Sequence, residues 1–165
     1  MMSLLVRHTF KSADDHIAQF SAMRILISAL ILLTTPAYAW EFTAAPICTL
    51  SHTTAEVEVR VTYDPRVPIY AIKLTRRDTA WRPSPTFALQ FDGSRALTIS
   101  TNRHSLSSAN TALTASDRGF SNVLDGLEFN TTATAKTASQ TLSIPLDGAA
   151  APVAAFRACT KGGTV

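Results

Sequence analysis

The chain of 165 residues lacks the short motifs that identify common enzymes and nucleotide-binding proteins. It contains no G-x-S-x-G nucleophile elbow, no H-E-x-x-H zinc helix and no G-x-x-x-x-G-K-[ST] phosphate loop. Its single Gly-Gly pair, Gly162-Gly163, follows Lys161 near the end of the chain and does not fit the phosphate-loop pattern. We therefore expect no ATP-driven activity.

The chain also lacks a basic stripe of the kind that tracks a phosphate backbone. After residue 39 it carries 12 Lys and Arg against 10 Asp and Glu, so the net charge of this part is +2. The basic residues are dispersed, and Arg76-Arg77 is the one adjacent pair among them. The high isoelectric point is thus not a sign of a nucleic-acid partner.

No apolar run is long enough to cross a bilayer. The longest, Ile25 to Leu33, spans nine residues with Ser28 among them, whereas a spanning helix needs roughly 20. Arg24 precedes this run, and Ala37-Tyr38-Ala39 offers a small-residue cleavage site before Trp40. This favours a signal peptide over residues 23–39, cleaved after Ala39, rather than a membrane anchor or a buried helix. A lipoprotein would have cysteine where Trp40 stands.

Residues 1–22 do not fit an export signal, because the polar stretch Lys11 to His16 lies upstream of the basic start. We interpret them as a mis-started or extended leader, so His8 and His16 leave the functional argument. The remaining residues, 40–165, have the usual length of one domain. We expect a periplasmic or secreted, monomeric protein of a Gram-negative bacterium with no membrane span after cleavage.

Two cysteines, Cys48 and Cys159, lie near the two ends of this domain. An oxidising compartment favours a disulfide between them, although two free thiols or a catalytic cysteine are the alternatives. Neither residue lies in a nucleophile motif, and no His or acidic ligands at a tight spacing complete a zinc site. We therefore expect a disulfide, no metal and no cofactor.

Apolar and polar residues alternate along several segments, which is typical of half-buried strands. The pattern runs from Ala55 to Tyr63 and from Ile69 to Thr75, and predicts one hairpin. Thr86 to Phe91 and Ala96 to Ser100, joined by an Asp-Gly turn, predict a second.

The other segments are less regular. An edge strand is expected between Trp40 and Leu50, and short strands or loops over 101–116. Thr131–Thr137 and Thr141–Pro145 predict a further hairpin, because both are rich in residues that favour strands.

Two short helices are expected. One is capped by Ser121 and kept short by Gly126. The other is C-terminal, with an apolar stripe through Val153 and Phe156 and with Arg157 pointing outward. The fold class is thus mainly β: a small antiparallel β-sandwich or barrel with one or two short helices.

This order of features resembles that of small exported alphaproteobacterial proteins of the invasion-associated locus B type. The resemblance is carried by the export signal, Trp40, Cys48, the β-rich middle and the tail Ile144–Gly148 before the Ala-rich helix Val153–Cys159. It implies a periplasmic or surface-exposed protein linked to host-cell association. It transfers no catalytic residue.

The chain is also similar to short exported proteins of the same bacteria that share the stretches WEF, PICTL, LTIST, DRGFSNVLDGLEFN and AAFRACT. Such proteins often carry the label of a DNA-repair excinuclease component, whose real members resemble helicases and need the phosphate loop. Because this chain lacks that loop, we interpret the label as mistaken and expect no role in DNA repair.

Candidate recognition residues lie in two segments. Arg76 to Pro85 has no period and two prolines, which predicts an exposed connection whose Trp81 could anchor a partner; its candidate residues are Arg76, Arg77, Trp81 and Arg82. The second segment is a turn at Asp117–Asn122, in which Arg118 could pair with a carboxylate. In both, the alternative is a purely structural role.

His52 and His104 are the titratable candidates for chemistry, and both lie in polar, turn-like sequence that suits a solvated or hydrogen-bonded histidine. Our leading hypothesis is therefore a non-enzymatic exported protein that binds an unknown protein or envelope component. The alternative is a small periplasmic hydrolase that uses His104 or His52, with Asp117 or Asp125 as a partner.

Overall fold

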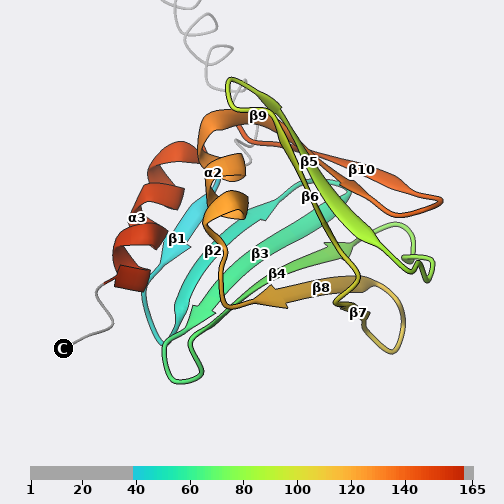
Figure 1. The fold of residues 1–165 in the computed structure, drawn as a ribbon, viewed down its shortest axis with the longest axis horizontal. Coiled ribbons are helices and arrows are strands. Elements are labelled where there is room, and N and C mark those ends of the chain that lie inside the picture. The colour runs from blue at the N-terminus through green and yellow to red at the C-terminus, as the bar shows by residue number, and fades with distance from the viewer. Residues whose placement is uncertain (1–38, 162–165) are drawn as a thin grey trace, which may run out of the picture. The chain divides into compact units, whose positions relative to one another are not determined.

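Alternating apolar side chains build two antiparallel sheets that face each other in a sandwich-like arrangement (Figure 1). The structure is a computed structural model and describes residues 39–161. The expected leader and signal peptide thus lie, apart from Ala39, outside the described residues. The mainly β fold with a C-terminal helix is confirmed.

The larger sheet has six strands in the spatial order β1-β2-β3-β4-β8-β7. Their bounds are β1 (Glu41–Thr43), β2 (Cys48–Thr53), β3 (Val57–Asp64), β4 (Ile69–Arg76), β7 (His104–Leu106) and β8 (Ala112–Asp117). The predicted hairpin is β3 and β4, which pair from Val57↔Arg76 to Asp64↔Ile69. The valines at the alternate positions of β3 are fully buried, as the period of two requires.

The smaller sheet has four strands in the order β10-β9-β5-β6. Its members are β5 (Phe87–Gly93), β6 (Leu97–Thr101), β9 (Asn130–Lys136) and β10 (Thr141–Pro145). Both predicted hairpins are present here, β5 with β6 and β9 with β10. Between β1 and β10 the chain crosses from one sheet to the other three times, and the last crossing contains a helix.

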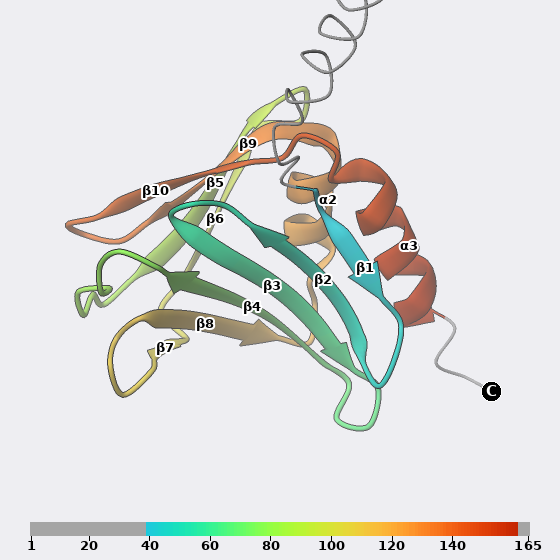
Figure 2. The same ribbon diagram turned by 180° about the vertical axis from the view of Figure 1, so that it is seen from behind.

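Two helices cover one end of the sandwich, where α3 lies beside β1 (Figure 2). They are α2 (Ser121–Phe129) and α3 (Ala150–Lys161). Val153 and Phe156 of α3 are fully buried, which confirms the predicted apolar stripe. Arg157, however, does not point into solvent: it makes ion pairs with Asp125 and with Glu128 of α2.

The predicted boundaries of α2 are wrong in two details. Its N-cap is Phe120, without a capping side chain, and Ser121 is the first helical residue. Gly126 does not shorten the helix but lies inside it. A Cβ at Gly126 would lie only 2.5 Å from the ring of Phe91, so the glycine serves close packing of α2 on β5.

The two sulfur atoms of Cys48 and Cys159 lie 2.00 Å apart, which is the distance of a disulfide. The pair connects the start of β2 to the last turn of α3, and its Cα atoms are 6.1 Å apart. This agrees with the expected bridge.

Candidate functional site

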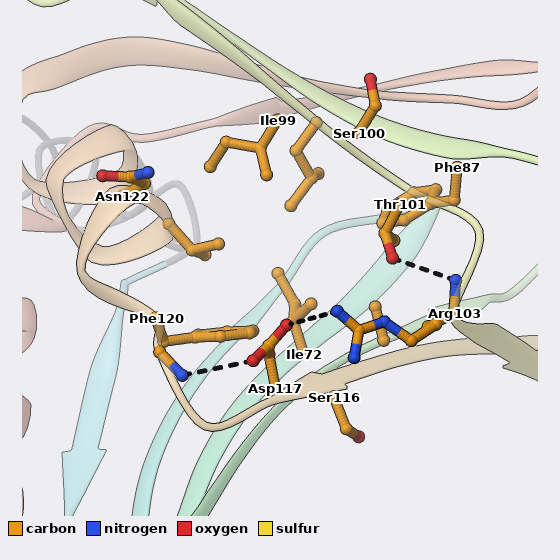
Figure 3. A pocket seen from close by; sticks show the side chains of 14 residues that line it. Ile72, Phe87, Ile99, Ser100, Thr101, Arg103, Ser116, Asp117, Phe120 and Asn122 are labelled. Carbon is orange, nitrogen blue, oxygen red and sulfur yellow. Dashed lines mark hydrogen bonds and ion pairs between the residues drawn. The ribbon is translucent and has the colours of Figure 1, made fainter.

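A pocket of about 170 Å³ opens between the two sheets on the side of β6 and β8, which we call the inter-sheet pocket (Figure 3). Both sheets, the turn after β8 and the first turn of α2 contribute to it. Its apolar lining consists of Ile72, Phe87, Leu89, Ile99, Ala115, Phe120 and Val123. Its polar lining consists of Ser100, Thr101, Arg103, Ser116, Asp117 and Asn122. Gly119, which has no side chain, also lines the pocket. An apolar interior with a polar margin suits a ligand group that is itself apolar.

The alternation of each strand explains this composition. Ile72 of β4 and Leu89 of β5 are buried core positions that face the opposite sheet. Ile99 of β6 is half-buried, because β6 is an edge strand and the pocket lies beside it. Figure 3 shows the hydroxyl groups of Ser100 and Ser116 pointing away from the cavity, so these residues line it with their main chain.

Asp117 and Arg103 form an ion pair at the margin of the pocket, with 3.6 Å between Arg103 Nη2 and Asp117 Oδ2 (Figure 3). The side chains are 78% and 49% exposed for Arg103 and Asp117, so the pair contributes about 0–1 kcal/mol. Asp117 has a second role, because its Oδ1 accepts hydrogen bonds from the main-chain N–H groups of Arg118 and Gly119. The N–H groups of Gly119 and Arg118, and then the charge of Arg103, lower the pKa of Asp117 below its ordinary value.

The turn after β8 is the turn that the sequence predicts. Arg118 is exposed and makes no ion pair within residues 39–161, whereas Asp117 pairs with Arg103. A Cβ added at Gly119 would meet no atom within 4 Å, so the margin of the pocket is open at this residue.

The other predicted segment, Arg76 to Pro85, begins at the opposite end of β8. The N–H of Arg76 donates to the carbonyl of Thr111, next to the first residue of β8, whereas the pocket lies at the last residue, Asp117. Arg77 and Arg82 lie in this segment, and Arg82 is exposed. The structure thus does not bring Arg118 together with the other predicted recognition residues.

Trp81 has the structural role that the sequence offered as the alternative to an exposed anchor for a partner. Its side chain is 1% exposed, and its indole N–H donates to the carbonyl of Leu74 at 3.1 Å. Arg76 places its guanidinium over the indole, 5.3 Å from the ring centroid. The anchor hypothesis is wrong because the indole lies against β4, so Trp81 is part of the core.

The two histidines lie in strands rather than in the turns that the sequence predicts, and the expectation of a hydrogen-bonded histidine holds for His52. His52 belongs to β2, is 2% exposed and stacks on Trp40 with 4.6 Å between ring centroids. Its Nδ1 lies 3.4 Å from the carbonyl oxygen of Ala39. Burial lowers the pKa of His52, and the contact with Ala39 partly opposes this.

His104 begins β7 and lies against Phe87, 6.0 Å between ring centroids, but it does not line the inter-sheet pocket. Within residues 39–161, no hydrogen bond or ion pair connects either His104 or His52 to an acidic side chain. The same residues contain no group of three His, Cys, Asp or Glu side chains that could hold a metal ion. In this part of the chain, no helix is sufficiently long and apolar to cross a membrane.

No protein-family model matches the chain, and neither a curated protein nor a solved structure matches it. The resemblance to exported alphaproteobacterial proteins therefore stays an expectation from the sequence.

The pocket itself was not visible in the sequence, because its apolar lining comes from segments between Ile72 and Val123 that look like ordinary core strands. The alternation along β6 predicts a strand. It does not tell whether a further strand pairs with the outer edge of β6. Arg103 carries no local pattern that distinguishes it from other surface arginines.

Proposed function

We propose that this is an exported, non-enzymatic protein that binds another protein or an envelope component. The inter-sheet pocket holds an apolar group of that partner. The observation that carries the proposal is the pocket itself: an apolar interior between two sheets, with Arg103 and Asp117 at its margin. Export is supported by the apolar segment before Trp40 and by the paired cysteines.

The alternative of a hydrolase that uses His104 or His52 has less support. A catalytic histidine needs an acidic or hydroxyl partner within hydrogen-bonding reach and access to a substrate. His52 is buried against Trp40, and His104 lies outside the residues that line the pocket.

The proposal is tested by capture of partners from periplasmic extract, with wild type compared against Gly119→Phe. Gly119 lines the pocket, and a Cβ added there meets no atom within 4 Å, so this position has room for a side chain. Ser143→Phe, on the exposed face of β10, adds the same ring elsewhere and serves as the control. A partner lost by Gly119→Phe and retained by Ser143→Phe supports the pocket as the binding site.

The segment Arg76 to Pro85 provides the opposite test. Arg77→Gln with Arg82→Gln removes two charges at the other end of β8. If this double variant loses the partner while Gly119→Phe retains it, the pocket is not the binding site. Fractionation and N-terminal sequencing test the export proposal, which requires a mature chain that begins at Trp40.

A further inference from the structure

The inter-sheet pocket opens beside two strand edges that lack a neighbouring strand within residues 39–161. β6 is the last strand of the smaller sheet and pairs with β5 alone. In the larger sheet, β7 pairs with Leu113 to Ala115 of β8, so Ser116 and Asp117 continue past the end of β7. An unpaired edge presents N–H and C=O groups that can pair with another chain.

We propose that the partner is an extended peptide segment of another protein, which adds as a strand to β6 and places one apolar side chain in the pocket. This inference rests on the proposed function and specifies how the partner is recognised. Main-chain hydrogen bonds to a sheet edge supply affinity in such complexes, and pockets for alternate side chains supply specificity.

The size of the pocket favours a single side chain over a whole small molecule. Its volume is about 170 Å³, whereas sites for drug-sized ligands enclose roughly 300–1,000 Å³. An engineered apolar cavity of about 150 Å³ in another protein accepts benzene. A phenyl or branched aliphatic side chain is therefore the group of matching size.

The position of β6 connects the edge to the pocket. Ile99 and Thr101 line the cavity with their side chains, whereas Ser100 lines it with its main chain (Figure 3). A strand laid along β6 thus runs directly past the pocket. Because side chains alternate along a strand, every second residue of the peptide faces the cavity side.

The charges at the margin favour an acidic residue in that peptide. Arg103 lines the pocket and is exposed, and Asp117 is its acidic partner there. Asp117 Oδ1 is already engaged by the N–H groups of the turn, and its ion pair with Arg103 is exposed and weak. A carboxylate of the peptide can therefore replace Asp117 as the ionic partner of Arg103 at little cost in free energy.

The first experiment selects short random peptides, displayed on phage, on the purified protein. We expect enrichment of peptides with one aromatic or branched aliphatic residue and an acidic residue. The enriched peptide is then synthesised, together with two forms that carry N-methyl groups on alternate amides. Fluorescence polarisation measures the Kd of each.

We expect one of the two N-methylated forms to bind at least about tenfold more weakly, because it loses several main-chain hydrogen bonds. Gly119→Phe is expected to weaken the parent peptide by about tenfold or more, and Arg103→Gln by about threefold to tenfold. Arg82→Gln removes another exposed arginine, one that does not line the pocket, and should leave Kd unchanged.

Sodium decanoate, an apolar chain with a carboxylate, is the second probe and separates the two proposals. If both N-methylated peptides bind as tightly as their parent, strand addition is overturned while the pocket stands as the binding site. The same conclusion follows if no peptide is enriched but decanoate binds and Gly119→Phe abolishes its binding. If neither probe binds, or if Gly119→Phe changes nothing, the inference and the proposed function both fail.

Discussion

Loss of the connection between Cys48 and Cys159 should cost this protein a large part of its stability. The bridge joins residues 111 positions apart in the chain, in β2 and α3. In the chain-entropy model, a loop of this length lowers the entropy of the unfolded chain by about 16 cal/mol/K, which corresponds to about 5 kcal/mol at 25 °C. The whole free energy of unfolding of a domain is typically about 5–15 kcal/mol.

The cleanest perturbation is reduction of the wild-type protein, because it removes the bond without removing an atom from the core. Urea unfolding, followed by circular dichroism with and without dithiothreitol, measures the difference. We expect the unfolding midpoint to fall and the slope of free energy against urea to rise, since a reduced chain is less compact when unfolded. Cys48→Ala with Cys159→Ala should reproduce both changes.

The refuting result is equally specific. If the oxidised and reduced proteins differ by less than about 1 kcal/mol, the entropy argument fails for this fold. Mass spectrometry of exported protein must also show the bridge; free thiols at Cys48 and Cys159 would remove the premise.

Three further predictions concern the core. Gly126→Ala should destabilise the fold by about 1–3 kcal/mol in urea unfolding, because its Cβ would lie 2.5 Å from the fully buried ring of Phe91; stability equal to wild type would contradict this packing. Trp81→Ala should lower the free energy of unfolding by about 3–5 kcal/mol. Trp81→Phe should lower it by about 1–3 kcal/mol, because it leaves the main-chain carbonyl of Leu74 without its donor. A thermal melt unaffected by both substitutions would mean that the indole is not buried. Burial lowers the pKa of His52 below 6.5, so the stability linked to it is complete above pH 6.5 and is lost as the pH falls toward the lowered pKa. Urea midpoints measured from about pH 4 to about pH 8 should show this loss in wild type and a smaller one in His52→Gln, and an NMR titration that places the pKa of His52 above its ordinary value would contradict the argument.

Much of the secondary structure could be predicted from the sequence, because strand and helix patterns depend on near neighbours. The valines of β3 recur with period two, and Val153 and Phe156 recur with the spacing of one helical turn. Gly126 shows the limit of this approach: a helix normally disfavours glycine, yet contact with Phe91 requires it there.

The candidate site was far less predictable. Trp81 and Arg157 both have the local sequence of exposed residues, and each acquires its partners from another part of the chain. Arg118 was identified from its turn, but Arg103, which lines the pocket, was not. Periodicity assigns a residue to the inner face of a sheet. It does not identify the distant segments of the chain that pack against that face.

The sequence by itself determined the mainly β class, the hairpins, the C-terminal helix and the two cysteines that can pair, because each of these depends on composition or on local spacing. The tertiary structure decided that β6 is an edge, that β8 extends past β7, and that a pocket opens between them. Those features depend on contacts between segments far apart in the chain, and no short stretch of residues encodes them. The inter-sheet pocket is the product of that non-local packing.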